Sequence, residues 1–95
     1  MAKGRAPSPR IRVYKAAGCG RCRQLERWLE QQRLPYLALD VERNRRAARE
    51  FQRYGGRGVP LVVVGEEVIQ GFHPQRILRR LGRDPRGGGR RRPSP

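Results

Sequence analysis

The sequence predicts a small α/β domain with the element order β-α-β-α-β-β-α, in which four strands form a mixed sheet. An initial strand–helix–strand pattern implies two parallel strands joined by a right-handed crossover. Two runs of β-branched residues around a short turn then predict an antiparallel hairpin. With 95 residues, the chain has no room for a second hydrophobic core.

The first half of the domain contains two strands and one helix. Residues 10–14 alternate polar and apolar side chains, as a short strand does. Residues 22–33 are predicted to be helical, because apolar side chains recur every three or four positions until Leu34-Pro35 ends the pattern. Residues 36–41 are an apolar run of strand length, which predicts a strand buried on both faces.

The second half contains a helix, a hairpin and a last helix. Apolar side chains between residues 47 and 54 predict a second amphipathic helix, which Gly55-Gly56 closes. Residues 61–64 and 68–70 are rich in valine and isoleucine and flank a Gly-Glu-Glu turn, so they predict the hairpin. The last helix is expected to begin near Pro74, a residue favoured in the first turn.

Positive charge dominates the composition. The chain has 23 Lys+Arg against 8 Asp+Glu, for a formal charge of +15. Residues 1–9 and 83–95 are rich in Gly, Pro, Ser and Arg, and are predicted to be disordered around a domain spanning residues 10–82. The arginine-rich tail suggests either a contact with nucleic-acid phosphates or simply a solvated tail, and we expect the solvated tail.

No apolar run reaches the roughly 18–20 residues needed to cross a bilayer. The first ten residues lack the apolar core of a secretory signal. We therefore expect a cytoplasmic protein, in which two cysteines are normally reduced. This composition excludes a membrane span, a disulfide scaffold and a multidomain enzyme.

The segment Cys19-Gly20-Arg21-Cys22 lies where the first strand passes into the first helix. Free backbone N–H groups and the helix dipole favour an anion there, and Lys15, Arg21 and Arg23 add positive potential, so a thiolate at Cys19 is expected to be stabilised. Cys22 lies about one turn further along, on the apolar side. Because only a thiolate attacks a disulfide, we predict Cys19 as the nucleophile and Cys22 as the resolving thiol.

Two other interpretations of the cysteines are a shared zinc site and plain core packing. A structural zinc site needs four ligands, whereas the two cysteines and His73 supply at most three per chain, so it would have to be shared in a dimer. Plain core cysteines are not expected beside a glycine at such a junction. A Cys-x-x-Cys next to a βαβ pattern favours redox chemistry. We interpret His73 as a loop residue, with a proton relay as the alternative, and Trp28 as a core residue.

Residues 11–81 resemble the glutaredoxins, small thioredoxin-fold proteins that reduce disulfides. Three features carry the resemblance: Val-Tyr before the Cys-x-x-Cys, Gly58-Val59-Pro60 before a strand, and Ile69-Gln70-Gly71-Phe72 after the hairpin. The resemblance implies that Pro60 is cis and faces the cysteines, with the Val59 backbone pairing with an extended thiol peptide. Lys15, Arg21, Val59, Pro60, Gly71 and Phe72 are thus the expected substrate-binding residues.

The chain departs from typical glutaredoxins in places that concern glutathione. Ala16 stands where the family usually has a Lys or Arg for a glutathione carboxylate, and Lys15 comes one residue early. Phe72, His73 and Pro74 stand where an acidic pair often holds the glutathione amino group. This ending is similar to that of glutaredoxin-like redoxins that donate electrons to ribonucleotide reductase and are reduced by thioredoxin reductase.

The sequence therefore predicts a monomeric dithiol–disulfide oxidoreductase that acts on protein disulfides or mixed glutathione disulfides. We expect no tightly bound cofactor and no metal, with glutathione or a thioredoxin-reductase-type flavoprotein as the electron donor. The substrate proteins could include acidic ones, which the positive charge would attract. Two alternatives remain at this point: a basic nucleic-acid-binding module, and a carrier of an iron–sulfur cluster shared between two chains.

Overall fold

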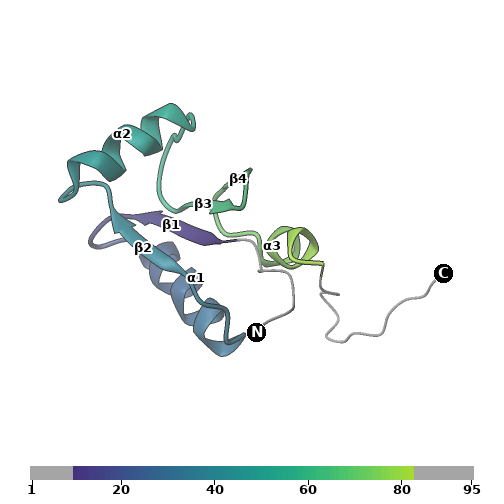
Figure 1. Ribbon diagram of the computed structural model, residues 1–95. Helices are drawn as coiled ribbons and strands as arrows, with labels where there is room; N and C mark the ends of the chain where they lie inside the picture. The colour runs from purple at the N-terminus through teal and green to yellow at the C-terminus, as the bar shows by residue number, and fades with distance from the viewer. Residues whose placement is uncertain (1–9, 83–95) are drawn as a thin grey trace, which may run out of the picture.

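The protein folds into a four-stranded sheet that carries helices on both faces (Figure 1). The computed structural model describes residues 10–82, so the predicted disorder of residues 1–9 and 83–95 lies outside the described part. The elements in chain order are β1 (Ile11–Lys15), α1 (Gly20–Gln31), β2 (Leu37–Asp40), α2 (Arg45–Arg53), β3 (Leu61–Val64), β4 (Glu67–Gln70) and α3 (Pro74–Arg80).

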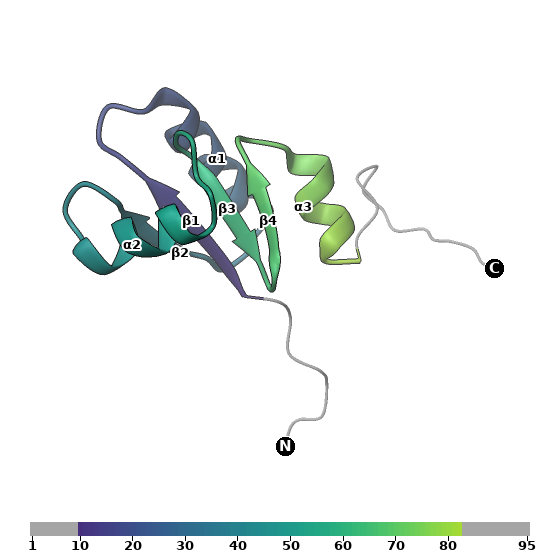
Figure 2. The same ribbon diagram turned by 90° about the horizontal axis from the view of Figure 1, so that it is seen from above.

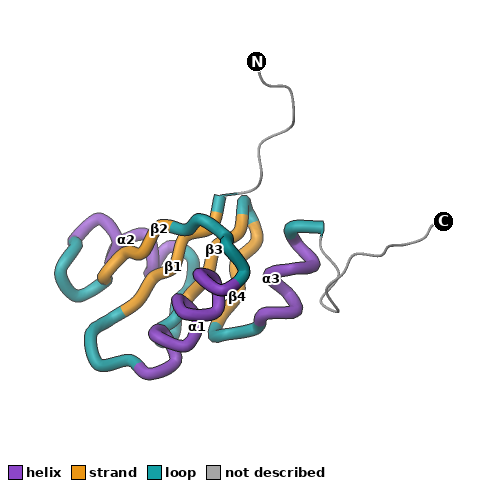
Figure 3. The backbone as a smooth tube through the Cα atoms, turned by 90° about the horizontal axis from the view of Figure 1, so that it is seen from below, coloured by secondary structure: helices purple, strands orange, loops and turns teal. Residues whose placement is uncertain are grey.

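The strand order is β2-β1-β3-β4, with β1 and β2 parallel and the other two pairs antiparallel. Helices α1 and α3 cover one face of the sheet and α2 covers the other (Figures 2 and 3). The predicted α/β class, element order and mixed four-stranded sheet are all confirmed. The arrangement is the thioredoxin-like fold that the resemblance implied.

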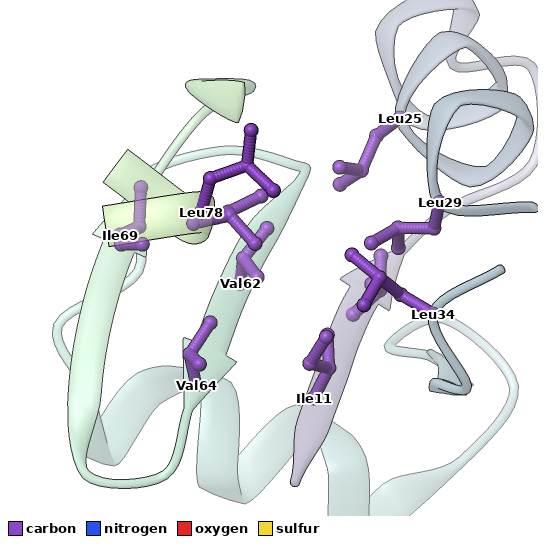
Figure 4. Close-up of a cluster of buried hydrophobic side chains, with 10 residues drawn as sticks. Ile11, Leu25, Leu29, Leu34, Val62, Val64, Ile69 and Leu78 are labelled. Carbon is purple, nitrogen blue, oxygen red and sulfur yellow. The ribbon is translucent and has the colours of Figure 1, made fainter. Parts of the chain in front are cut away.

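The two central strands, β1 and β3, contribute side chains to the core on both faces of the sheet, because alternate side chains of a strand point to opposite faces. Val13 of β1 and Val62 of β3 face α1 and α3, whereas Tyr14 and Leu61 face α2. Figure 4 shows the larger cluster, in which Leu25 and Leu29 of α1 approach side chains of β1, β3, β4 and α3. This packing sets the position of α1, and with it the start of that helix.

Hydrogen bonds hold α2 against the other face. The buried Tyr14 donates its hydroxyl proton to Glu50 at 2.7 Å, and Arg12 donates to the Tyr54 hydroxyl at 2.8 Å. Burial, together with the bond to Glu50, raises the pKa of Tyr14 well above its usual range, so this hydroxyl stays a donor. Asn44 caps the start of α2, because its side chain accepts a hydrogen bond from the Ala47 amide at 3.0 Å.

One burial prediction is wrong. The apolar run at residues 36–41 does form a strand, but β2 is an edge strand and is not buried on both faces. Leu37 remains 51% exposed, and Ala38 is exposed as well. Hydrophobicity alone cannot tell an edge strand from a central one, because strand order depends on pairings with distant segments.

The helix predicted over residues 22–33 begins and ends two residues earlier, at Gly20 and Gln31. Arg33 adopts a left-handed conformation with φ of 58°, which turns the chain toward β2.

Within residues 10–82, no helix has the length and apolarity needed to cross a membrane.

Replacing the fully buried Leu29 by alanine should reduce the free energy of unfolding by about 2–5 kcal/mol, because a cavity opens between α1 and the sheet. Leu37→Ala is the matched control: on the exposed edge strand it should cost less than about 1 kcal/mol. Urea denaturation measures both. Similar losses in the two variants would contradict the described core.

Candidate active site

The junction between β1 and α1 places the two cysteines. Gly18 has φ of +75°, a conformation that glycine adopts freely, and it turns the chain out of the strand. Cys19 then caps the helix: its Sγ accepts a hydrogen bond from the Cys22 backbone N–H at 3.1 Å. This is the usual N-cap pattern, in which the cap side chain accepts from the amide three residues on. The cap brings the two cysteines within one helical turn.

The two sulfurs lie in different surroundings. Cys19 is partly exposed, whereas Cys22 is only 2% exposed, and both thiols are free. Burial raises the pKa of the Cys22 thiol to about 12, and its hydrogen bond with Cys19 and the negative charge of Glu26 act in the same direction. The backbone of Ala16 acts in the opposite direction. Cys22 is therefore held as a neutral thiol at neutral pH.

A loop before β3 faces Cys19. The Val59–Pro60 peptide bond is cis, as the family resemblance implied. Cys19 Sγ lies 3.8 Å from the Val59 carbonyl oxygen. The Pro60 carbonyl accepts from the Gly71 amide at 2.9 Å, and Gly71 has φ of +92°. The structure thus brings together four of the residues singled out in the sequence: Cys19, Val59, Pro60 and Gly71.

Gln70 fastens this loop, a role that sequence reasoning did not assign. Its side-chain nitrogen donates to the Gly58 carbonyl at 2.7 Å, and its side-chain oxygen accepts from the Arg57 amide at 3.1 Å. The residue lies at the end of β4, and the loop comes before β3. The contact could be seen only once the structure had placed β4 beside β3. Gln70 does belong to one of the motifs that carried the family resemblance, but the motif did not show this contact.

Arg21 and Lys15, the two basic residues among the sequence-derived candidates, differ in their ion pairing. Arg21 is exposed beside Cys19, and within residues 10–82 no carboxylate lies within ion-pair distance of it. Lys15 instead pairs with Glu26, with 3.1 Å between Nζ and Oε2. The charge of Lys15 is therefore compensated by Glu26 of α1, a contact that the sequence analysis did not predict.

Phe72 and His73 complete the list of sequence-derived candidates. Phe72 packs edge-on against Trp28, with 6.0 Å between the ring centroids, so both rings border the α1–α3 side of the core. His73 is exposed and precedes α3 without a capping side-chain bond. Among the described residues, no group of three or more His, Cys, Asp or Glu side chains could hold a metal ion.

Two thiols one turn apart can exchange with a disulfide, because the accessible sulfur can attack the substrate and the buried sulfur can then attack the mixed disulfide. With this pair at the strand–helix junction of a thioredoxin-like sheet, opposite a cis proline, the chain has the features of a thiol–disulfide oxidoreductase. The glutaredoxin family model matches residues 11–69, and the chain belongs to that family.

The comparisons agree with this assignment. The glutaredoxin-like protein NrdH of Escherichia coli strain K12 is 30% identical over 70 residues, which are 74% of this chain and 86% of the relative. The solved NrdH-redoxin from Escherichia coli has a TM-score of 0.68 at 30% identity and covers 74% of this chain and 92% of its own. The thioredoxin-like protein BC3987 has a TM-score of 0.71 at 26% identity and covers 76% and 100%.

A buckwheat glutaredoxin–glutathione complex shares the fold, with a TM-score of 0.63 at 20% identity and coverage of 78% of this chain and 77% of its own.

Alkylation should distinguish the two thiols. Iodoacetamide at pH 8 should modify Cys19 at least about tenfold faster than Cys22, because reaction needs an accessible thiolate. Labelling of Cys22 should increase as pH rises toward 12, where its raised pKa lets the thiolate form. Peptide mass spectrometry measures both rates. Equal labelling of the two residues at pH 8 would show that Cys22 is not shielded.

Proposed function

We propose that this protein reduces protein disulfides by a two-thiol mechanism. The Cys19 thiolate attacks one sulfur of the substrate disulfide, forming a mixed disulfide and releasing one substrate thiolate. Cys22 then loses its proton and attacks Cys19 Sγ, which releases the second substrate thiolate and leaves a Cys19–Cys22 disulfide. Two electrons pass from the protein to the substrate. The observation that carries the proposal is the partly exposed Cys19 sulfur, which caps α1 by accepting a hydrogen bond from the Cys22 amide.

For substrate binding, we propose that an extended segment on either side of the substrate cysteine lies along the cis-proline loop. The contact of Cys19 with the Val59 carbonyl supports this, because a peptide that brings its sulfur to Cys19 passes that backbone. Gly71, tied to Pro60, and the Phe72 ring next to it would border the segment. Arg21 beside Cys19 would favour acidic partners and speed their encounter.

For the electron donor, we propose a thioredoxin-reductase-type flavoprotein in place of glutathione. Lys15 pairs with Glu26 and is not available for a glutathione carboxylate, while Ala16 offers no charge. The solved NrdH-redoxin from Escherichia coli is described as having a thioredoxin-like activity profile. This chemistry suits the cytoplasm, where such reductases keep thiols reduced.

Cysteine variants test the two-thiol mechanism. Cys19→Ser should reduce a small disulfide no faster than the uncatalysed thiol reaction, because the accessible sulfur is gone. Cys22→Ser should accumulate the mixed disulfide on Cys19, which mass spectrometry detects as a stable adduct. A Cys19→Ser variant with parental activity, or a Cys22→Ser variant that never retains substrate, would rule out the proposed roles.

A reductase assay tests the donor. Oxidised protein is offered either thioredoxin reductase with NADPH, or glutathione with glutathione reductase and NADPH. We expect NADPH consumption in the first mixture to be at least about tenfold faster, a difference of roughly 1.4 kcal/mol in transition-state stabilisation. Faster reduction by the glutathione system would contradict the proposed donor while leaving the two-thiol mechanism intact.

A further inference from the structure

A carboxylate lies one helical turn beyond the buried thiol. Cys22 and Glu26 are four residues apart on α1, which puts their side chains on the same face of the helix. The Glu26 side chain is only 18% exposed, and its Oε2 atom is 3.1 Å from Lys15 Nζ. Lys15 in turn is the last residue of β1, directly before Ala16, whose backbone contacts the Cys22 thiol.

The resolving step needs a proton acceptor at this place. A thiol does not attack a disulfide until its proton has left, and Cys22 is buried where water has little access. The environment of Cys22 strongly favours the protonated form. Without a nearby base, resolution would depend on rare deprotonation by solvent hydroxide.

Other charged and titratable side chains of α1 and of the neighbouring segments either bind other groups or are exposed. Glu30, one turn further along α1, accepts a hydrogen bond from the Tyr36 hydroxyl at 3.0 Å. Asp40, paired in register with Lys15, accepts from the amides of Glu42 and Arg43. Arg23 and Arg27 are exposed on the outer side of α1. His73, the single histidine of the chain, is exposed before α3.

We propose that Glu26 accepts the Cys22 proton in the resolving step and that Lys15 is the positioning residue that holds the carboxylate in place through their ion pair. This inference rests on the proposed two-thiol mechanism. As the S–H bond of Cys22 breaks, its proton passes to a Glu26 oxygen, and the Cys22 electron pair forms the bond to Cys19 Sγ. The bond between Cys19 and the substrate sulfur breaks, and the departing thiolate takes up a proton from Glu26 or from water.

Glu26→Gln separates this role from simple repulsion, because the two effects have opposite signs. If Glu26 only repels the Cys22 thiolate, removal of its charge eases deprotonation and resolution becomes faster. If Glu26 accepts the proton, resolution becomes slower, and general-base catalysis typically contributes about 10²–10⁴-fold. Glutamine has nearly the same shape, so packing around α1 is retained.

The experiment uses the reduced full-length protein and an aromatic disulfide whose thiolate product is coloured, followed by stopped-flow absorbance. The first thiolate released reports attack by Cys19, and the second reports resolution by Cys22. In Glu26→Gln the first phase should keep its parental rate, and the second should slow by about 100-fold at pH 7. The rate of the second phase should then rise about tenfold per pH unit, as expected when hydroxide replaces the base.

Variants of Glu30 and Lys15 serve as controls for the Glu26 result. Glu30→Gln, one turn further along the same helix, should leave both phases at parental rates. Lys15→Met should slow the second phase, whereas Lys15→Arg should restore most of it. A second phase in Glu26→Gln that is within twofold of the parent, or faster, would overturn the role of Glu26 while leaving the mechanism standing. A first phase that persists in Cys19→Ser would instead refute the proposed mechanism itself.

Discussion

The hydrogen bond from the Cys22 amide to the Cys19 sulfur is the interaction on which the site depends. It starts α1, and it sets the two sulfurs one turn apart. An amide in the first turn of a helix has no acceptor within the helix, so a sulfur in the capping position satisfies it and gains a positive partner. The core packing of Leu25 and Leu29 holds α1 against the central strands, and this keeps the cap at the end of β1.

The charged residues of the site differ in their exposure and in their pairing. Arg21 is exposed to solvent beside Cys19, where we propose that its charge favours acidic partners. Lys15 and Glu26 form a pair on the inner side, near Cys22. A dithiol enzyme needs one sulfur that meets the substrate and a second that reacts only after the mixed disulfide has formed. The different surroundings of Cys19 and Cys22 match that order of events.

Local patterns in the sequence predicted all seven elements, because helical and strand periodicities arise from neighbouring residues. The cysteine pair could be recognised for the same reason, and the family resemblance supplied the cis peptide at Pro60. The exposure of β2 could not be predicted, because it depends on which strand lies next to which. The contacts of Gln70 and the pairing of Lys15 with Glu26 likewise join segments that only the folded chain brings together.

Amide hydrogen exchange at Cys22 tests the capping interaction most directly. The Cys22 amide should exchange slowly in the reduced protein, and at the parental rate in Cys19→Ser, because a serine oxygen also accepts this bond. In Cys19→Ala the same amide should exchange much faster, while amides in the middle of α1 remain protected. An unchanged Cys22 exchange rate in Cys19→Ala would show that the sulfur does not cap the helix and would contradict this account of the site.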